Sequence, residues 1–280
     1  MKQLDINFET LTALYNQGLS CQKIADQLNC SEAYVSKSLR AEGITKRTNR
    51  DYRTKQLFNH HLFDAINTET SAYWLGALMA DGCVMTKKSG QHVIALVVKD
   101  REWIQNFIES LDGNFHVKTY GDVYGVYLTS EHMFHSLGLQ GCVPRKSLTL
   151  QFPTLPKEMI SHFIRGYFDG DGSVIVSQAQ NKNRTSTIYK TISICICGTY
   201  EFLKTLQSHI GGNLSKEKRR TSNTWKLTFS GTNKCRIFYQ YLYTDATLYL
   251  SRKKNKFESY YKERGSTTII DHPNKDEGIV

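Results

Sequence analysis

Two aspartates in matching surroundings are the residues of this sequence best placed to do chemistry. Asp81 ends the segment 74–81 and Asp171 ends the segment 164–171, and a glycine follows each aspartate. The two carboxylates lie 90 residues apart, and both segments are mainly apolar. A single Asp-Gly pair is a common turn, whereas two copies after similar segments indicate an internal repeat.

Small residues predict how these two segments pack. Each segment reads as a helix with two small residues four positions apart, which share one helix face. These are Gly76 and Ala80 in the first segment and Gly166 and Gly170 in the second. Two helices that cross along such faces approach closely. We therefore expect Asp81 and Asp171 to meet at the same end, with Gly82 and Gly172 as left-handed caps.

Adjacent carboxylates at helix ends need a counter-charge. A helix C-terminus already carries partial negative charge, so an aspartate there is disfavoured unless a cation neutralises it. Carboxylates together with helix-end carbonyls and water are the ligands that Mg²⁺ prefers. The pattern around Asp81 and Asp171 therefore predicts a site for Mg²⁺ or Mn²⁺.

The elements that must hold these aspartates also repeat. After residue 82 we expect strands at 83–86 and 92–98, a helix at 103–111, strands at 115–119 and 123–129, and a helix at 131–137. After residue 172 we expect strands at 174–177 and 188–197, a helix at 200–210, strands at 213–218 and 225–229, and a helix at 234–242. Both units read αββαββα, so the predicted fold class is α+β with two pseudo-symmetric halves.

The N-terminal segment predicts a small all-α module. Apolar spacing indicates three short helices between residues 8 and 43, and Ser20 and Ser31 are suitable N-caps. Two short helices joined by a tight turn resemble a helix-turn-helix. Such a motif would present Tyr34, Ser36, Lys37 and Arg40 to DNA, although purely structural three-helix units share the pattern.

The positive charge lies outside that module. The net charge of the chain is +10, of which residues 1–42 carry −1 and residues 43–280 therefore carry +11. Arg47, Arg50 and Arg53 form a basic arm whose spacing suits phosphates or a minor groove. Basic clusters attract nucleic acid, although a solvated, solubilising surface is the alternative.

Several classes of protein are disfavoured. No apolar run approaches the roughly 18 residues of a membrane span, and the N-terminus lacks the apolar stretch of a signal peptide. The seven cysteines have no C-x-x-C spacing, so we expect a reduced, intracellular and cytoplasmic protein with no zinc ribbon. Cys195 and Cys197 read as small buried thiols on one strand face rather than metal ligands, and the pair His60-His61 reads as incidental.

The paired segments resemble the LAGLIDADG homing endonucleases in their single-chain, two-motif form. The resemblance covers most of residues 71–262. It implies two halves whose saddle-shaped antiparallel sheets sit on duplex DNA, in a monomer with internal pseudo-two-fold symmetry. It also implies that Asp81 and Asp171 bind two or three catalytic ions, with the Ala80 and Gly170 carbonyls as auxiliary ligands.

The resemblance further implies a basic pocket with one lysine late in each half. Lys146 and Lys253 are the candidates, either as catalytic residues or as ordinary phosphate contacts. One departure is Met79, which replaces the first motif aspartate, whereas Asp169 is present in the second copy. That position is not the usual metal ligand, so the implied activity is cleavage of both strands of a long DNA site.

Two alternatives use the same scaffold, namely a non-catalytic DNA-binding regulator and an intron maturase acting on RNA.

Candidate base contacts are Gln178, Gln180, Arg219, Arg220 and Lys226. The expected organisation is a helix-turn-helix module at 1–44, a basic linker or arm at 45–70, halves at 71–150 and 151–262, and a polar tail at 263–280.

Overall fold

The computed structural model describes residues 7–17, 19–44, 57–180, 188–217 and 224–263. The chain divides into two compact units, Met1–Lys55 and Gln56–Val280. The first unit consists of α1 (Phe8–Asn16), α2 (Cys21–Gln27) and α3 (Glu32–Ala41). The Asn7, Ser20 and Ser31 side chains cap the three helices in turn. Its own small core contains Leu11, Tyr15, Cys21, Ile24, Ala25, Val35 and Leu39.

The second unit begins with the expected helix and four strands of the first half. Its elements are α4 (Glu69–Ala80), β1 (Gly82–Thr86), β2 (His92–Val98), α5 (Arg101–Ser110), β3 (Lys118–Tyr120), β4 (Val123–Thr129), α6 (Glu131–Leu139) and the short 3₁₀ helix η1 (Lys146–Leu148). The strands form an antiparallel sheet in the order β1-β2-β4-β3.

The second half repeats this plan and adds a helix. Its elements are α7 (Lys157–Asp171), β5 (Gly172–Gln180), β6 (Ile188–Gly198), α8 (Tyr200–Ile210), β7 (Asn213–Lys216), β8 (Trp225–Ser230), α9 (Thr232–Tyr243) and α10 (Ser251–Glu263). The sheet order β5-β6-β8-β7 corresponds to that of the first half. The predicted α+β class with two antiparallel sheets in two halves is confirmed.

Each sheet has one covered and one open face, because side chains alternate along a strand. In β6 the buried side chains are Ile192, Ile194 and Ile196, which face the helices. Cys195 and Cys197 alternate with them and are half-exposed, so the prediction of buried thiols is wrong. The isoleucines fill the covered face, and the thiols lie on the open one.

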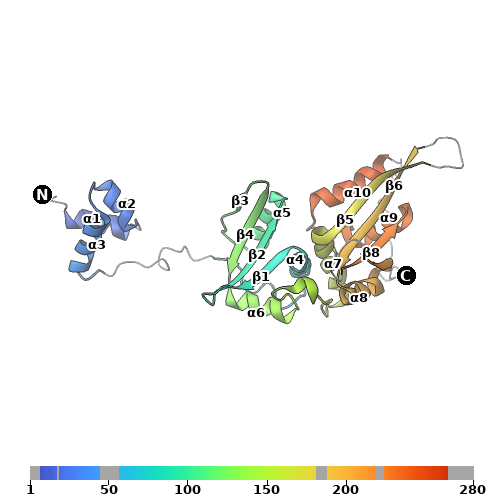
Figure 1. The fold of residues 1–280 in the computed structure, drawn as a ribbon, viewed down its shortest axis with the longest axis horizontal. Coiled ribbons are helices and arrows are strands. Elements are labelled where there is room, and N and C mark those ends of the chain that lie inside the picture. The colour runs from blue at the N-terminus through green and yellow to red at the C-terminus, as the bar shows by residue number, and fades with distance from the viewer. Residues whose placement is uncertain (1–6, 18, 45–56, 181–187, 218–223, 264–280) are drawn as a thin grey trace. The chain divides into compact units, whose positions relative to one another are not determined.

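Helices α4 and α7 lie side by side between the two halves (Figure 1). A Cβ added to Gly76 would lie 2.1 Å from the Phe163 carbonyl oxygen, and one added to Gly166 would lie 1.9 Å from the Tyr73 oxygen. The two helix backbones therefore touch. Because later residues of α4 meet later residues of α7, the two helices run in the same direction.

The cap prediction for Gly82 and Gly172 is wrong. Gly172 has φ −82°, and among the described residues Gly82 is not one of the glycines with positive φ. A Cβ on Gly82 would lie 2.5 Å from the Leu78 carbonyl oxygen, and one on Gly172 would lie 2.0 Å from the Phe168 ring. Both positions thus exclude a side chain for lack of space.

The segment before α4 also differs from the expected linker. Phe63 and Ile66 are buried and belong to the main hydrophobic core, so the part of 45–70 that the structure describes packs with the first half. Among the described residues, no helix has the length and apolar character needed to cross a bilayer.

Candidate metal centre and nucleic-acid interface

The two aspartates lie where α4 and α7 end together. Asp81 is the C-cap of α4, and Asp171 is the last residue of α7. A Cβ on Gly170 would lie 2.3 Å from the Ala80 Cβ and 3.3 Å from Oδ2 of Asp81. Since Gly170 directly precedes Asp171, this close approach brings both carboxyl groups to one place. The missing side chain at Gly170 leaves the space in which the Asp81 carboxylate rests.

The surroundings of these carboxyl groups disfavour their negative charge. Burial raises the pKa of Asp81, against the opposing effect of the Lys253 and Lys146 charges. Burial and then the charge of Asp81 raise the pKa of Asp171. Both residues nevertheless keep substantial contact with solvent. Two ionised groups that repel each other at a solvent-accessible point suit a cation from solution.

One lysine from each half reaches the C-terminal ends of α4 and α7, the two motif helices. Lys146 Nζ donates to the Gly82 carbonyl oxygen. Lys253 Nζ donates to the carbonyl oxygens of Phe168 at 2.6 Å and Gly170 at 2.9 Å. Both lysines are buried, and burial lowers the pKa of Lys253 to about 8. The Gly170 carbonyl, an expected metal ligand, therefore already accepts a hydrogen bond in this structure.

The two lysines are not held in equivalent ways. Lys146 begins η1, directly after Arg145, whose φ is +59°. Lys253 lies in the first turn of α10, and Leu250, just before that helix, donates its backbone N–H to Oδ2 of Asp169 at 2.7 Å. Asp169 thereby fixes the start of the helix that carries Lys253. In the first half the corresponding residue is Met79, which is buried in the core.

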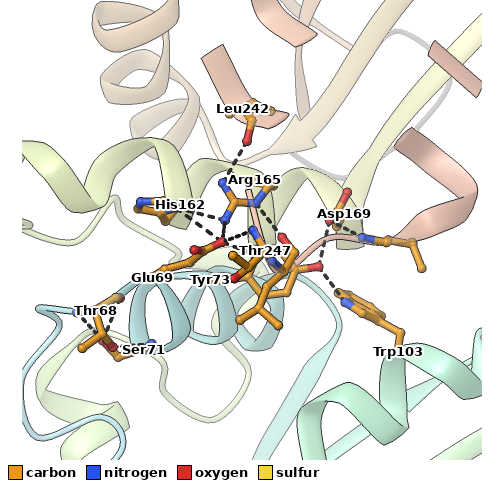
Figure 2. Close-up of polar contacts among 12 residues, drawn as sticks. Thr68, Glu69, Ser71, Tyr73, Trp103, His162, Arg165, Asp169, Leu242 and Thr247 are labelled. Atoms are coloured by element: carbon orange, nitrogen blue, oxygen red, sulfur yellow. Dashed lines mark hydrogen bonds and ion pairs between the residues drawn. The ribbon is translucent and has the colours of Figure 1, made fainter. Parts of the chain in front are cut away.

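Asp169 sits in a buried polar network between the halves (Figure 2). Its carboxylate accepts hydrogen bonds from Tyr73 at 2.8 Å and Tyr243 at 2.7 Å, and Tyr73 in turn accepts one from the Trp103 indole. Burial raises the pKa of Asp169, while the hydrogen bond from Tyr243 acts in the opposite direction. With its oxygens occupied by these donors, Asp169 is a structural residue rather than a metal ligand.

A second part of the network joins α4, α7 and the loop before α10 (Figure 2). Glu69 accepts hydrogen bonds from Arg165 at 2.5 Å and from the Thr247 and Leu248 backbone amides at 2.9 and 3.1 Å. Arg165 also donates to the carbonyl oxygens of Leu248 and Leu242. No local sequence pattern predicts this cluster, because Glu69 and Arg165 are 96 residues apart.

A pocket of about 530 Å³ lies beside Asp81 and receives residues from both halves. Asp100 and Trp103 come from the first half, whereas Gly170 and Arg252 come from the second. Arg252 and Asp100 form a two-pronged ion pair across this boundary, with distances of 3.1 and 3.0 Å. The pocket gives water access to Asp81 at the point where the halves meet.

The open sheet faces present a mixed polar and aromatic surface. Sheet register places Lys226 beside Cys197 on the open face of the second half. Gln178 alternates with Ser177 along β5 and is exposed, so its role as a base contact stays a prediction. Sheet register places further residues on the open faces that no sequence pattern marked, namely Lys118, Tyr120, Tyr127, Ser173, Ile175, Ser177 and Thr228.

The other predicted DNA contacts fall into two groups: some are exposed on α3, and the rest lie outside the described residues. In the first unit Lys37 and Arg40 are exposed on α3, whereas Val35 and Leu39 form its buried face. Arg47, Arg50, Arg53, Arg219, Arg220 and the side chain of Gln180 lie outside what the structure describes.

Comparison with known proteins supports the architecture. The sequence pattern of a LAGLIDADG-like domain matches residues 158–243, and no curated protein sequence matches the chain significantly. The structure of the I-SmaMI LAGLIDADG homing endonuclease bound to cleaved DNA is similar, with a TM-score of 0.51 and 14% identity over 71% of this chain and 91% of that one.

Two further structures give the same result. I-SmaMI bound to uncleaved DNA in the presence of calcium ions has a TM-score of 0.52 and 13% identity, over 71% of this chain and 93% of that one. The LAGLIDADG meganuclease I-AabMI bound to uncleaved DNA has a TM-score of 0.50 and 10% identity, over 73% and 93%. This chain thus has a LAGLIDADG homing endonuclease-like fold.

Proposed function

We propose that this chain is a site-specific endonuclease that hydrolyses phosphodiesters on both strands of a long double-stranded DNA target. The observation that carries the proposal is the meeting of Asp81 and Asp171 at one end of two helices in backbone contact. One chain supplies both carboxylates, so a monomer would suffice. Among proteins with this fold, I-SmaMI is described as bound to cleaved DNA.

The donor set fits Mg²⁺ or Mn²⁺. Asp81 and Asp171, with the Ala80 and Gly170 carbonyls, would hold two or three ions with water in the other positions. Such ions supply activation of water and stabilisation of the leaving oxygen in an in-line displacement. The raised carboxyl pKa values and the space left by Gly170 support this assignment.

The lysines have a separate role in the proposal. Lys146 and Lys253 would neutralise negative charge that develops on the phosphate of each strand. Their hydrogen bonds to the carbonyls at the motif-helix ends place both ammonium groups beside the aspartates. If they only position phosphates, their loss would weaken binding without a larger loss of cleavage.

The open faces of the two sheets would contact the duplex. Lys118 and Lys226 on these faces would meet phosphates, whereas Tyr120, Tyr127 and Ser177 would lie toward base edges or sugars. The net charge of +10 supports binding to a polyanion.

The N-terminal unit is proposed to be a helix-turn-helix that contacts DNA beside the main site. Ser20 and Ser31 begin two short helices, and α3 presents Tyr34, Ser36, Lys37 and Arg40 away from Val35 and Leu39. The basic linker or arm at 45–70, which carries Arg47, Arg50 and Arg53, would join this contact to the proposed cleavage site.

The test is incubation of the full chain with genomic DNA in Mg²⁺ or in EDTA, followed by sequencing of the ends. We expect discrete Mg²⁺-dependent breaks with a constant stagger. On the target so found, Asp81→Asn and Asp171→Asn would each lower cleavage of at least one strand by about 100-fold or more, with DNA binding largely kept. Asp122→Asn, at an exposed aspartate paired with Lys99, is the matched control.

Unchanged double-strand cleavage by both active-site variants would disprove the assignment. Tight DNA binding with no break in several divalent metals would indicate the non-catalytic regulator. Preferential binding of structured RNA would indicate the maturase.

A further inference from the structure

A histidine-aspartate cluster lies outside the proposed cleavage site. His61 Nδ1 donates to Oδ2 of Asp64 at 2.7 Å, and His132 Nε2 lies 2.7 and 2.9 Å from the two carboxylate oxygens. The His61 and His132 rings face each other with 4.4 Å between centroids. Asp64 and His132 are 68 residues apart in the sequence, so the fold alone brings the three groups together.

We propose that His61, Asp64 and His132 form a binding site for a divalent transition metal ion of the Zn²⁺ class. Their ligating atoms all lie within 4.8 Å of one another. Imidazole nitrogen and carboxylate oxygen are the ordinary non-sulfur ligands of Zn²⁺, and three protein ligands leave a fourth position for water. Nitrogen donors favour this ion over Mg²⁺, which prefers oxygen.

Metal binding requires only a small adjustment. Metal–ligand distances of about 2.0–2.1 Å place neighbouring tetrahedral ligand atoms roughly 3.3 Å apart. The nitrogen–carboxylate separations of 2.7–2.9 Å must therefore widen by about half an ångström. The ligating nitrogens of His61 and His132, which lie within 4.8 Å of each other, must reach the same spacing. The side chains of His61 and His132 are 70% and 48% exposed, so neither ring needs to displace core atoms.

The backbone and the surrounding groups hold the three side chains in place. Ser136 Oγ donates to Oδ1 of Asp64 at 2.7 Å, a contact of the kind that orients a ligating carboxylate. Phe63, between His61 and Asp64 in the chain, is fully buried, as is Met133 next to His132. The ligands therefore project from two anchored segments, and a bound ion would clip the segment before α4 to α6.

A neighbouring group of residues provides an internal control. His92, Glu131 and His135 also satisfy the distance limit for a metal group. However, the His92 ring stacks on Phe134 at 4.0 Å and its Nδ1 is hydrogen-bonded with Thr86, while His135 lies 3.9 Å from Glu131. This group lacks the tight contacts to a shared carboxylate; His92 begins β2, whereas Glu131 and His135 lie on α6.

The test is a titration of the EDTA-treated and dialysed full chain with ZnCl₂ by calorimetry, in excess Mg²⁺ so that the proposed Asp81–Asp171 site is occupied, with the melting temperature followed in parallel. We expect one Zn²⁺ equivalent that raises the melting temperature, and Co²⁺ at the same site should show the absorption of a tetrahedral complex. His61→Ala and His132→Ala should each weaken binding by more than about 100-fold, and Ser136→Ala by roughly 10-fold. His135→Ala and Asp81→Asn should keep the equivalent.

Absence of any Zn²⁺ equivalent in the wild-type chain would overturn the proposal. So would an equivalent that survives both His61→Ala and His132→Ala, or one that His135→Ala removes. Because the His61 side chain is mostly exposed, we expect the His61→Ala variant without metal to melt at the wild-type temperature. This melting curve is the control for folding. The readouts are binding and stability, so the result does not depend on nuclease activity.

Discussion

The first half of the second unit ends in the three-residue helix η1, whereas the second half ends in the thirteen-residue helix α10. Both elements deliver one buried lysine to the ends of the motif helices. In the second half, Asp169 binds the backbone just before α10, and in the first half Met79 packs in the core. The lysine ammonium group is therefore positioned by a different structural element in each half.

This difference shows which parts of the repeat tolerate change. The glycines at the contact of α4 and α7 recur in both halves, because any side chain there would overlap a backbone atom. The residue two positions before the aspartate differs, because the buried polar Asp169 and the buried apolar Met79 both fill that place in the core. Backbone contact is the stricter requirement.

The largest expected effect concerns this contact. Gly76→Ala and Gly166→Ala should each lower the free energy of unfolding by roughly 3 kcal/mol or more, because the added methyl would lie about 2 Å from a carbonyl oxygen. Denaturant titration measures the change. Gly138→Ala, a helical glycine with open space around it, should be neutral or slightly stabilising. If Gly76→Ala or Gly166→Ala kept the wild-type stability, the backbone contact between α4 and α7 would be contradicted.

The next effect is on catalysis and rests on the proposed function. Lys253→Met and Lys146→Met should each slow cleavage of one strand by about 100-fold, since each removes one charge beside one scissile phosphate. Strand-resolved gels would show nicked product in both cases, with opposite strands intact. If either variant slowed cleavage of both strands equally, the assignment of one lysine to each strand would be wrong.

A smaller effect separates Asp169 from Met79. Asp169→Asn should cost roughly 2–3 kcal/mol of unfolding free energy, because an NH₂ group would replace one of the two oxygens that accept three buried hydrogen bonds. Met79→Leu should cost less than about 1.5 kcal/mol, as a swap of similar volume. Comparable losses measured by urea unfolding would show that the polar network contributes no more than apolar packing.

The smallest effect is a difference in pH dependence between Glu69 and Asp169. Burial opposes ionisation of Glu69, but the Leu248 and Thr247 amides and Arg165 lower its pKa below 4.5. Its contribution is therefore present above pH 4.5 and is lost as the pH falls further. Burial raises the pKa of Asp169 above 3.8, so the advantage of wild type over Asp169→Asn should shrink as the pH rises through that value.

Stability curves of wild type, Glu69→Gln and Asp169→Asn between pH 3 and 7 would reveal these opposite slopes. Slopes of the same sign would show that one of the two carboxyl groups has a different environment from the one described.

The sequence alone predicted that Asp81 and Asp171 end two closely packed helices. Local patterns predict the order of strands and helices and the positions of Asp81, Asp171 and the glycines beside them. They do so because periodicity and small-residue spacing depend only on residues that are close together in the sequence. The prediction for Gly172 failed for a related reason. A left-handed cap and a close contact both require glycine, and the sequence does not distinguish them.

What the tertiary structure decided depends on partners far apart in the chain. The hydrogen bonds that surround Asp169, the ion pair of Glu69 with Arg165, and the meeting of Asp64 with His132 join residues 68 to 96 positions apart. The open placement of Cys195 and Cys197 was also decided there, because alternation fixes two faces but not which one is covered. Local sequence therefore determined which residues repeat, and packing determined which groups each one meets.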